Sequence, residues 1–414
     1  MIWGQNPYKP AAAAGGLHYA RPFISLTSMP SLPRPAPPQH PARPMCQKAS
    51  AALGALGLSL ALLDPSMALA GKAKPGAARS GIEQGAMRYA GQPAADELAR
   101  EIAQRRGWEL EWVRRWIGQS QQLPSVIKLS APAPVATAKN WAAYRSRFIE
   151  ARRIEAGHSF WQAQRETLER AEARYGVPAW LVIGIIGVET YYGRHTGNYR
   201  VLDALATLSL DFPASHPRAA ARQAYFRSEL EALLELSREQ GISPDAWRGS
   251  YAGAMGLPQF MPGSWLKYAV DFDGDGRIDL RNSPADAIGS VANYMKQHGW
   301  QSGMLTHYPV QLIAHGEQLA TLLGPDIKPS FPASSLHAMG ARLEETALQH
   351  VGPLALVELR NGDPLQGGAD PSYVAGTENF YAVTRYNWSS YYALAVIELG
   401  QAVQAALAER AAQR

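Results

Sequence analysis

Apolar residues recur at helical spacing through most of this 414-residue chain. Between Ala94 and Ile117 they lie three or four positions apart, a period that predicts amphipathic helix. The stretch from Trp180 to Val188 is apolar on every side, which is typical of a buried helix, and Pro178 stands near its first position. The same spacing predicts further helices over residues 140–174, 219–240, 285–298 and 391–410.

A strand-like pattern is confined to the later part of the chain. Residues 309–360 are mixed in character and end in a strand-like run from Pro353 to Arg360. Residues 373–386 are rich in aromatic and β-branched side chains. Because the chain is too long for one simple core, we expect a mainly α (α+β) fold with two or three subdomains.

The first 44 residues are predicted to be no part of the folded body. They are rich in proline, alanine and glycine, and seven prolines lie between Pro30 and Pro44. Proline at this density excludes a helix or a central strand. We interpret Met45 as the start of translation and the preceding residues as an over-long reading of the gene.

Residues 45–70 have the order of a secretory signal peptide. Lys48 precedes an apolar run of roughly 15 residues, and an Ala-x-Ala site follows at Ala68–Ala70. The run is shorter than the roughly 20 apolar residues that a membrane-spanning helix needs, which favours the signal peptide. A membrane anchor or a buried helix is the alternative interpretation. We expect cleavage at this site, a linker over residues 71–92, and a periplasmic protein without a stable membrane span in its mature form.

Composition and charge exclude several classes of protein. Hydrophobic residues make up 46% and charged residues 18%, which is typical of a soluble globular protein and excludes disorder of the whole chain. The net charge of +5 favours an anionic polymer or surface as a neighbour. Since the chain has no Lys/Arg-rich run and no zinc-finger spacing, we expect no nucleic-acid partner. The single cysteine, Cys46, precedes the apolar run and is lost with it, so the mature chain has no disulfide and no cysteine nucleophile.

One carboxyl group stands at the end of the most apolar segment. Glu189 directly follows this segment, and Gly193 is expected to terminate the helix. Burial raises the pKa of a carboxyl group, and so does the negative end of a helix. Glu189 is therefore a candidate general acid. The alternative is a structural ion pair between Glu189 and an arginine such as Arg194 or Arg222.

Residues 271–282 match the start of an EF-hand calcium loop. Carboxylates alternate along it, and Gly276 permits the sharp turn. Asn282 stands at the twelfth position in place of a bidentate glutamate, and Asp286 is a second candidate for that carboxylate. We expect calcium of modest affinity in a structural role, and the alternative is a solvated acidic turn without metal. The candidate ligands are Asp271, Asp273, Asp275, the backbone carbonyl of Arg277, Asp279 and Asp286.

Five short motifs occur in order through the body of the chain: Gly187-Val-Glu189-Thr190, Leu202–Leu208, Gly253–Pro262, Asp286–Tyr294 and Thr384–Asn387. Together they resemble the lytic murein transglycosylase B family. The resemblance runs from about Tyr144 to Gly400, and several motifs in order over that span are more specific than any one of them.

The resemblance implies a lysozyme-like helical core with an EF-hand-like calcium loop, an N-terminal helical subdomain and a small β-containing subdomain. We expect this core to be extended at both ends of the sequence. The expected boundaries are 1–70 for the extension and signal peptide, 71–92 for the linker, 93–176 for the N-terminal helical subdomain, 177–300 for the catalytic core, 301–384 for the β-containing subdomain and 385–414 for a segment that returns to the core.

The resemblance also implies an activity. Enzymes of the family cleave the β-1,4 bond between N-acetylmuramic acid and N-acetylglucosamine in the glycan strands of peptidoglycan. The residue that matches the catalytic glutamate is Glu189, which would protonate the leaving oxygen and then take a proton from the muramyl 6-hydroxyl. That hydroxyl closes onto C1, so a 1,6-anhydro sugar forms and no water is consumed. An internal nucleophile explains why no second carboxylate is obvious near Glu189; Asp203 and Asp211 are the nearest in sequence.

The glycan-binding residues that the resemblance implies come from several motifs. For each aromatic residue among them, ordinary core packing is the alternative. This chain departs from the family pattern at Leu257-Pro258, where a Tyr-Gly-like pair is expected, at Tyr191-Tyr192, where an Arg-Trp-like pair is familiar, and at Asp273, where a serine can occur. The expected glycan-binding residues are Gln259, Phe260, Met261, Tyr294, Tyr386, Asn387 and Tyr392, with Tyr144 and Arg222 as further candidates.

Three other functions compete with this prediction. A muramidase would hydrolyse the same bond with the same acid, and sequence separates the two poorly. An inactive peptidoglycan-binding module would keep the cleft, although the intact Glu189 and Gln259 argue against it. A calcium-dependent interaction protein is disfavoured by the single, imperfect loop. We expect the protein to act as a monomer.

Overall fold

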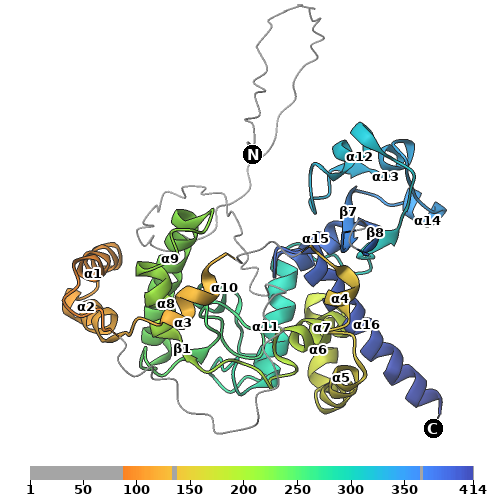
Figure 1. The fold of residues 1–414 in the computed structure, drawn as a ribbon. Coiled ribbons are helices and arrows are strands. Elements are labelled where there is room, and N and C mark those ends of the chain that lie inside the picture. Colours follow the sequence, from red (N-terminus) through yellow and green to blue (C-terminus); the bar gives the residue numbers. More distant parts are fainter. Residues whose placement is uncertain (1–86, 133–137, 364–366, 414) are drawn as a thin grey trace, which may run out of the picture. The chain divides into compact units, whose positions relative to one another are not determined.

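The computed structural model describes residues 87–132, 138–363 and 367–413 (Figure 1), which all fall within one compact unit. The expected extension and signal peptide, with Cys46, and most of the expected linker lie outside the described residues.

The first part of the described chain is helical. The sequence predicted helices over residues 94–117 and 140–174, and the structure divides each of these segments into shorter helices. Gly107, with a φ of 66°, ends the first of them, where its left-handed conformation costs no Cβ clash. The helices are α1 (Pro93–Arg106), α2 (Leu110–Gln119), α3 (Pro124–Ser130), α4 (Trp141–Arg145), α5 (Ala151–Ala163) and α6 (Arg165–Tyr175).

The middle of the chain is also mostly helical and holds only one pair of two-residue strands. Its buried side chains, among them Leu181, Ile185 and Phe226, belong to the main hydrophobic core together with residues of α1, α2 and α6. The elements are α7 (Ala179–Thr190), β1 (Tyr199–Arg200), α8 (Val201–Leu210), α9 (Ala219–Gln240), β2 (Arg248–Gly249), α10 (Pro262–Tyr268) and α11 (Pro284–Gln297).

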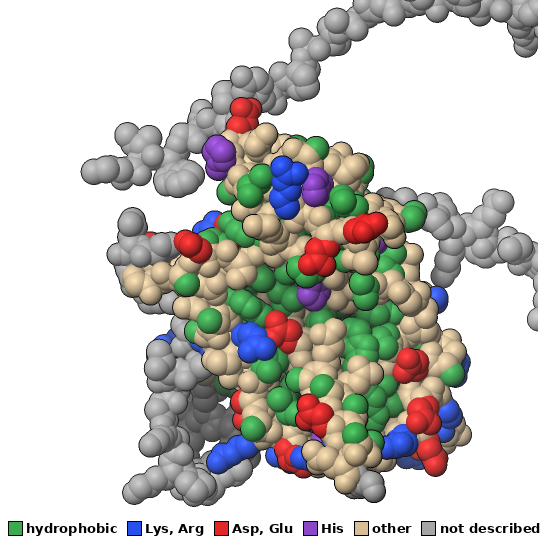
Figure 2. All heavy atoms as spheres, turned by 90° about the vertical axis from the view of Figure 1, so that its right-hand side faces the viewer, with side chains coloured by type: hydrophobic (Ala, Val, Ile, Leu, Met, Phe, Trp, Pro, Cys, Tyr) green, Lys and Arg blue, Asp and Glu red, His purple; other side chains and the backbone are tan. Residues whose placement is uncertain are grey.

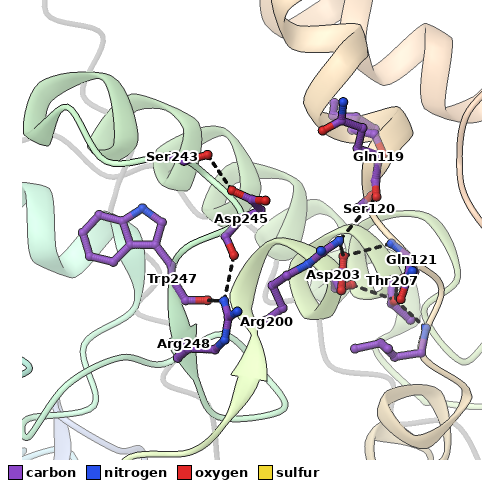
Figure 3. A network of polar contacts seen from close by, with 12 residues as sticks. Gln119, Ser120, Gln121, Arg200, Asp203, Thr207, Ser243, Asp245, Trp247 and Arg248 are labelled. Carbon is purple, nitrogen blue, oxygen red and sulfur yellow. Dashed lines mark hydrogen bonds and ion pairs between the residues drawn. The ribbon is translucent and has the colours of Figure 1, made fainter. Parts of the chain in front are cut away.

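A polar network joins the N-terminal helices to this middle part (Figure 3). The buried carboxylate of Asp203, on α8, accepts hydrogen bonds from the backbone N–H of Gln121 at 2.9 Å and from the Arg200 guanidinium at 2.8 Å. One turn further along α8, the hydroxyl of Thr207 accepts a hydrogen bond from the backbone N–H of Leu123 at 3.0 Å. Two backbone donors of the segment between α2 and α3 are therefore satisfied by side chains of α8.

The strands are concentrated between residues 307 and 376. A four-stranded antiparallel sheet has the order β3-β8-β7-β5, with Val357 opposite Val374, and β4 pairs with β6. These residues share a second, smaller hydrophobic cluster around Leu336 and Leu354. The elements are β3 (His307–Pro309), β4 (Gln311–Leu312), α12 (Gly316–Leu323), β5 (Phe331–Pro332), α13 (Ala333–Ala338), β6 (Ala341–Arg342), α14 (Glu345–Leu348), β7 (Pro353–Asn361) and β8 (Ala369–Gly376).

The aromatic and β-branched segment 373–386 is only partly a strand. β8 ends at Gly376, and the side chain of Thr377 caps a new helix, α15 (Glu378–Thr384), by accepting hydrogen bonds from the N–H groups of Asn379 and Phe380. The cap satisfies two N–H groups that have no partner in the first turn. Composition favoured strand here, but the capping threonine converts the second half to helix.

The last helix, α16 (Ser390–Ala412), packs closely against α7. Glycines permit the approach: a Cβ on Gly184 would lie 2.1 Å from the carbonyl oxygen of Val396, and a Cβ on Gly400 would lie 2.0 Å from that of Trp180. Because α7 and α16 are nearly 200 residues apart in sequence, this contact brings together side chains that no local motif connects.

One helix among the described residues, α16, is long and apolar enough to cross a membrane. The helices α6 and α7 also pass that criterion as a pair, but they are bent by 116°. More than half of the apolar window of α16 is buried inside the protein, as expected for a core helix.

Candidate active site

Glu189 is the penultimate residue of α7, whose other residues are buried almost throughout. The helix ends at Thr190, because Tyr191 and Tyr192 adopt left-handed conformations with φ values of 53° and 59°. The prediction that Gly193 terminates the helix was therefore wrong by two residues. A left-handed conformation costs a residue other than glycine about 1–2 kcal/mol, so surrounding contacts must hold this turn.

The carboxyl group of Glu189 is densely surrounded by protein, and no charged side chain contributes to its pKa. Burial raises its pKa to about 7, although a hydrogen bond from the Tyr392 hydroxyl to Oε1, at 2.7 Å, opposes the rise. The residue as a whole is only partly buried, so Glu189 remains accessible to a ligand. Within the described residues no ion pair involves Glu189, and the alternative of a structural pair with Arg194 or Arg222 is wrong.

An aromatic cluster surrounds the hydroxyl that contacts Glu189. The ring of Tyr386 stacks on that of Tyr392 at 6.3 Å with an interplanar angle of 13°. Tyr294 and Phe260 contact Tyr386 in turn, with ring centroids 4.8 Å and 5.9 Å away. The pKa values of Tyr392 and Tyr386 are raised by burial and, to a smaller extent, by the charge of Glu189. Four of the sequence-predicted residues therefore gather beside Glu189.

The predicted Gln259 lies in a tight loop that approaches the end of α7. The backbones of Met255 and Phe260 pair across the loop, and Gln259 has a φ of 51°. Its side-chain amide donates hydrogen bonds to the carbonyl oxygens of Thr196, at 3.1 Å, and Gly256, at 3.0 Å. The hydroxyl of Thr190 donates to the carbonyl oxygen of Leu257 at 2.9 Å, which fixes this loop to the residue after Glu189.

The remaining predicted residues differ in their relation to Glu189. Met261 is buried and directly precedes α10, and Asn387 is buried with its side-chain oxygen unpaired among the described residues. Tyr144 is buried near Glu189. Burial raises the pKa of Tyr144 most, and the charge of Glu189 raises it further. Arg222 instead lies over the ring of Phe212 at 5.9 Å, and within the described chain no hydrogen bond or ion pair joins it to Glu189.

Three acidic residues of the predicted calcium loop converge. One side-chain oxygen from each of Asp271, Asp273 and Asp286 lies within 4.8 Å of the other two. Asp286 is almost fully buried and accepts hydrogen bonds from the backbone N–H groups of Phe272, at 2.8 Å, and Asp279, at 2.7 Å. Oxygen-only donors of this kind suit a hard cation such as calcium.

The other candidate ligands of this loop face neighbouring backbone. Asp275 accepts a hydrogen bond from the N–H of Arg277 at 2.8 Å. Asp279 accepts hydrogen bonds from the N–H groups of Arg281 and Asn282, and from the side-chain amide of Asn282 at 2.8 Å. Asp286, the second candidate for the missing carboxylate, therefore joins the cluster, whereas Asn282 is paired with Asp279.

A family model for the transglycosylase SLT domain matches residues 90–401. The chain belongs to this family. The membrane-bound lytic murein transglycosylase B of Escherichia coli (strain K12) is 39% identical over 323 residues, which cover 76% of this chain and 84% of that relative. The expectation from the sequence motifs, that the chain is similar to lytic murein transglycosylases, is thereby confirmed.

Two solved structures of lytic transglycosylases are similar along most of the chain. The Escherichia coli enzyme Slt35 in complex with calcium is 37% identical, covers 80% of this chain and 99% of its own, and has a TM-score of 0.65. SltB3 from Pseudomonas aeruginosa in complex with NAG-anhNAM-pentapeptide is 29% identical, covers 75% of this chain and 78% of its own, and has a TM-score of 0.59. The mostly helical fold with small sheets is thus the fold of this transglycosylase family.

Sequence reasoning missed two charged residues of this transglycosylase. Glu229, on α9, is buried, burial raises the pKa of its carboxyl group, and it accepts a hydrogen bond from the N–H of Gly263 at 2.8 Å. Its position among the buried Phe226, Leu230 and Leu233 was a visible signal. The second residue, Arg153, contacts the end of α7, and no motif in the sequence marks it.

One face of the protein mixes charges of both signs (Figure 2). Figure 2 shows one face, on which acidic and basic side chains are interspersed and hydrophobic side chains gather near the middle. Such interspersed charge is ordinary for a soluble protein. The expectation that nucleic acid is not a partner stays a prediction.

Proposed function

We propose that this protein is a lytic transglycosylase that cleaves the β-1,4 bond between N-acetylmuramic acid and N-acetylglucosamine in peptidoglycan, with Glu189 as its single acid and base. The observation that carries the proposal is the buried Glu189 carboxyl group, which has a pKa of about 7 and a tyrosine hydroxyl on one oxygen. Membership of the transglycosylase SLT domain family and the names of the relatives support the reaction class.

The first step uses the protonated form of Glu189. With a pKa of about 7, roughly half of the molecules hold this proton at neutral pH, whereas an ordinary glutamate would hold almost none. Oε1 is engaged by Tyr392, so Oε2 is the oxygen that faces the glycosidic bond. Glu189 donates its proton to the leaving oxygen of N-acetylglucosamine as the bond to C1 of the muramyl sugar breaks.

The second step uses the same residue as a base. The Glu189 carboxylate takes the proton of the muramyl 6-hydroxyl, and that oxygen bonds to C1. The proton thus returns to Glu189, and the products contain the atoms of the substrate without added water. The Tyr392 hydroxyl donates to the carboxylate between the two steps and stabilises its charge.

The alternative of a muramidase calls for a second group that activates water or binds C1. A retaining glycosidase places its two carboxyl groups about 5–5.5 Å apart. Among the described residues no other carboxylate contributes to the pKa of Glu189. Asp203 is bound to Gln121 and Arg200, and Asp211 accepts hydrogen bonds from Tyr89 and Gln122, so the two acids nearest to Glu189 in sequence have structural partners.

The proposed glycan-binding residues follow from the cluster around Glu189. Aromatic faces suit sugar rings, and the amides of Gln259 and Asn387 suit hydroxyl and acetamido groups. The unpaired side-chain oxygen of Asn387 supports a ligand contact, because buried polar atoms rarely lack a partner. The residues proposed to bind the glycan are Gln259, Phe260, Met261, Tyr294, Tyr386, Asn387, Tyr392 and Tyr144, while Arg222 is proposed only as a more distant contact.

We further propose that calcium binds the acidic loop. Asp271, Asp273 and Asp286 would hold the ion, with Asp275, Asp279 and the carbonyl of Arg277 completing the loop as its candidate ligands. The calcium complex of the relative Slt35 supports this assignment. When bound, the ion would neutralise three converging carboxylates and so stabilise the loop that precedes α11.

The cellular location and organisation follow from the same reaction. Because peptidoglycan lies outside the cytoplasm, the enzyme must be exported, which supports the proposed signal over residues 45–70 and a periplasmic location. The relative from Escherichia coli is described as membrane-bound. The subdomain boundaries set out above and a monomeric state remain part of this proposal.

Mass spectrometry of the soluble products from purified peptidoglycan tests the proposal, with Glu189→Gln digested in parallel. Products one water lighter than the corresponding hydrated muropeptides, present for the wild type and absent for the mutant, are expected. Hydrated reducing ends would show a muramidase. Soluble products from neither protein would indicate an inactive binding module.

A further inference from the structure

The turn that follows Glu189 is held by an arginine from another helix. Arg153, on α5, donates a hydrogen bond from Nη1 to the carbonyl oxygen of Gly187 at 2.7 Å. The same oxygen accepts the backbone N–H of Tyr191 at 3.1 Å. The last carbonyl groups of a helix have no partner within the helix, and a cation placed there is favourable. Arg153 therefore supplies, from another helix, a second hydrogen bond to a carbonyl oxygen in the last turn of α7.

The guanidinium of Arg153 is also packed between aromatic rings. It lies 4.6 Å from the ring centroid of Tyr191 and 5.3 Å from that of Phe148. Arg194 lies over the ring of Tyr191 at 5.0 Å. The left-handed Tyr191 is thus fixed by its side chain as well as by its backbone N–H.

Tyr192 packs against the glycine that Arg153 binds. A Cβ on Gly187 would lie 2.6 Å from the hydroxyl oxygen of Tyr192, which fills the space between Gly187 and Gly157. That hydroxyl is buried and has no hydrogen-bond partner among the described residues, so it fills space without binding the helix end. The polar contact at Gly187 comes from Arg153 and the turn itself.

We propose that Arg153 is a positioning residue: it holds the last turn of α7 and the Tyr191-Tyr192 turn so that Glu189 keeps its orientation toward the glycosidic bond. The inference rests on the proposed function, because it assigns Arg153 a part in that reaction. Glu189 lies two residues after Gly187 and two before Tyr191, inside the segment that Arg153 binds at both ends. A displacement of about 1 Å at a reacting group can lower a rate on the order of 100-fold.

The test compares Arg153→Met, Arg153→Lys and the matched control Arg152→Met, an exposed arginine one position earlier on α5. Rates are measured as anhydro-product release from soluble glycan strands, after thermal unfolding has established that each variant is folded. For R153M we expect kcat to fall roughly 10- to 100-fold while KM changes less than about threefold, because orientation rather than binding is lost. R153K, which keeps a cation and a donor, should recover part of the rate, and R152M should match the wild type.

Hydrogen–deuterium exchange provides a measurement that does not depend on activity. The backbone N–H groups of Tyr191 and Tyr192 donate to the carbonyl oxygens of Gly187 and Ile186. These amides should exchange faster in R153M than in the wild type, and at the wild-type rate in R152M. The proposal is overturned if R153M keeps its kcat, if only KM changes, if R153K is no better than R153M, or if exchange over residues 187–195 is unaltered. A wild type that releases no anhydro product would refute the proposed function itself. The comparison among the Arg153 variants tests only the positioning role.

Discussion

Replacing Glu189 with glutamine should stabilise the protein while abolishing its activity, and the stabilisation should depend on pH. Burial raises the pKa of Glu189 from the ordinary 4.5 to about 7. Below about pH 4.5 the carboxyl group is protonated in both the folded and the unfolded chain, so it imposes no penalty. Between these two values the unfolded chain ionises and the folded chain does not, so the wild type loses stability as the pH rises.

The magnitude follows from the two pKa values. The difference between 4.5 and about 7 corresponds to roughly 3 kcal/mol at about 1.4 kcal/mol for each pH unit. Glutamine cannot ionise and pays no such penalty. The free energy of unfolding of E189Q relative to the wild type should therefore increase by roughly 3 kcal/mol between pH 4.5 and pH 8, with most of the increase complete near pH 7.

Urea denaturation at several pH values measures this difference, at constant salt and calcium. The control is Glu169→Gln, since Glu169 is an exposed glutamate on the neighbouring helix α6. This variant measures the effect of removing a carboxyl group that is not buried. A stability difference for E189Q that is the same at pH 4.5 and pH 8 would show that Glu189 titrates normally, and the acid role deduced from its burial would then be refuted.

Three further predictions concern Tyr392, the contact between α7 and α16, and the calcium loop. Tyr392→Phe removes the hydrogen bond that lowers the pKa of Glu189, so the alkaline limb of the kcat–pH profile should move to higher pH, and a move to lower pH would contradict the geometry. Gly184→Ala places a Cβ against the carbonyl oxygen of Val396. Chemical denaturation should show a free energy of unfolding that is lower by about 1–3 kcal/mol. An unchanged stability would mean that α7 and α16 are not in close contact. Calcium should raise the Tm of the wild type in calorimetry and raise that of Asp286→Asn much less, and equal gains would exclude Asp286 as a ligand.

Local sequence was sufficient where a single segment carries the chemistry. The apolar run before Glu189 predicted a buried helix with a carboxyl group at its end, and that is α7. The alternating acidic residues predicted the calcium loop pattern, and two of them, Asp271 and Asp273, converge with Asp286. Periods of hydrophobicity and carboxylate spacing are properties of one segment, so they can be read without knowledge of its neighbours.

The resemblance went further and named residues on separate segments. It placed Tyr386 and Tyr392 with Glu189 although the spacing of residues predicts no such contact, and the structure brings the three together. The physical cause is the close packing of α7 on α16 through Gly184 and Gly400, which neither segment specifies alone.

Only the tertiary structure decided the contacts made between distant segments. The sequence left open whether Glu189 pairs with an arginine, and the fold gives it burial and a tyrosine hydroxyl in place of a charged partner. It also placed the end of α7 at Thr190, because Arg153 from α5 and the packed rings of Tyr191 and Tyr192 stabilise a turn that local preference opposes. Backbone propensity belongs to the residue itself, whereas desolvation and the compensation of strain depend on what the rest of the chain packs against it.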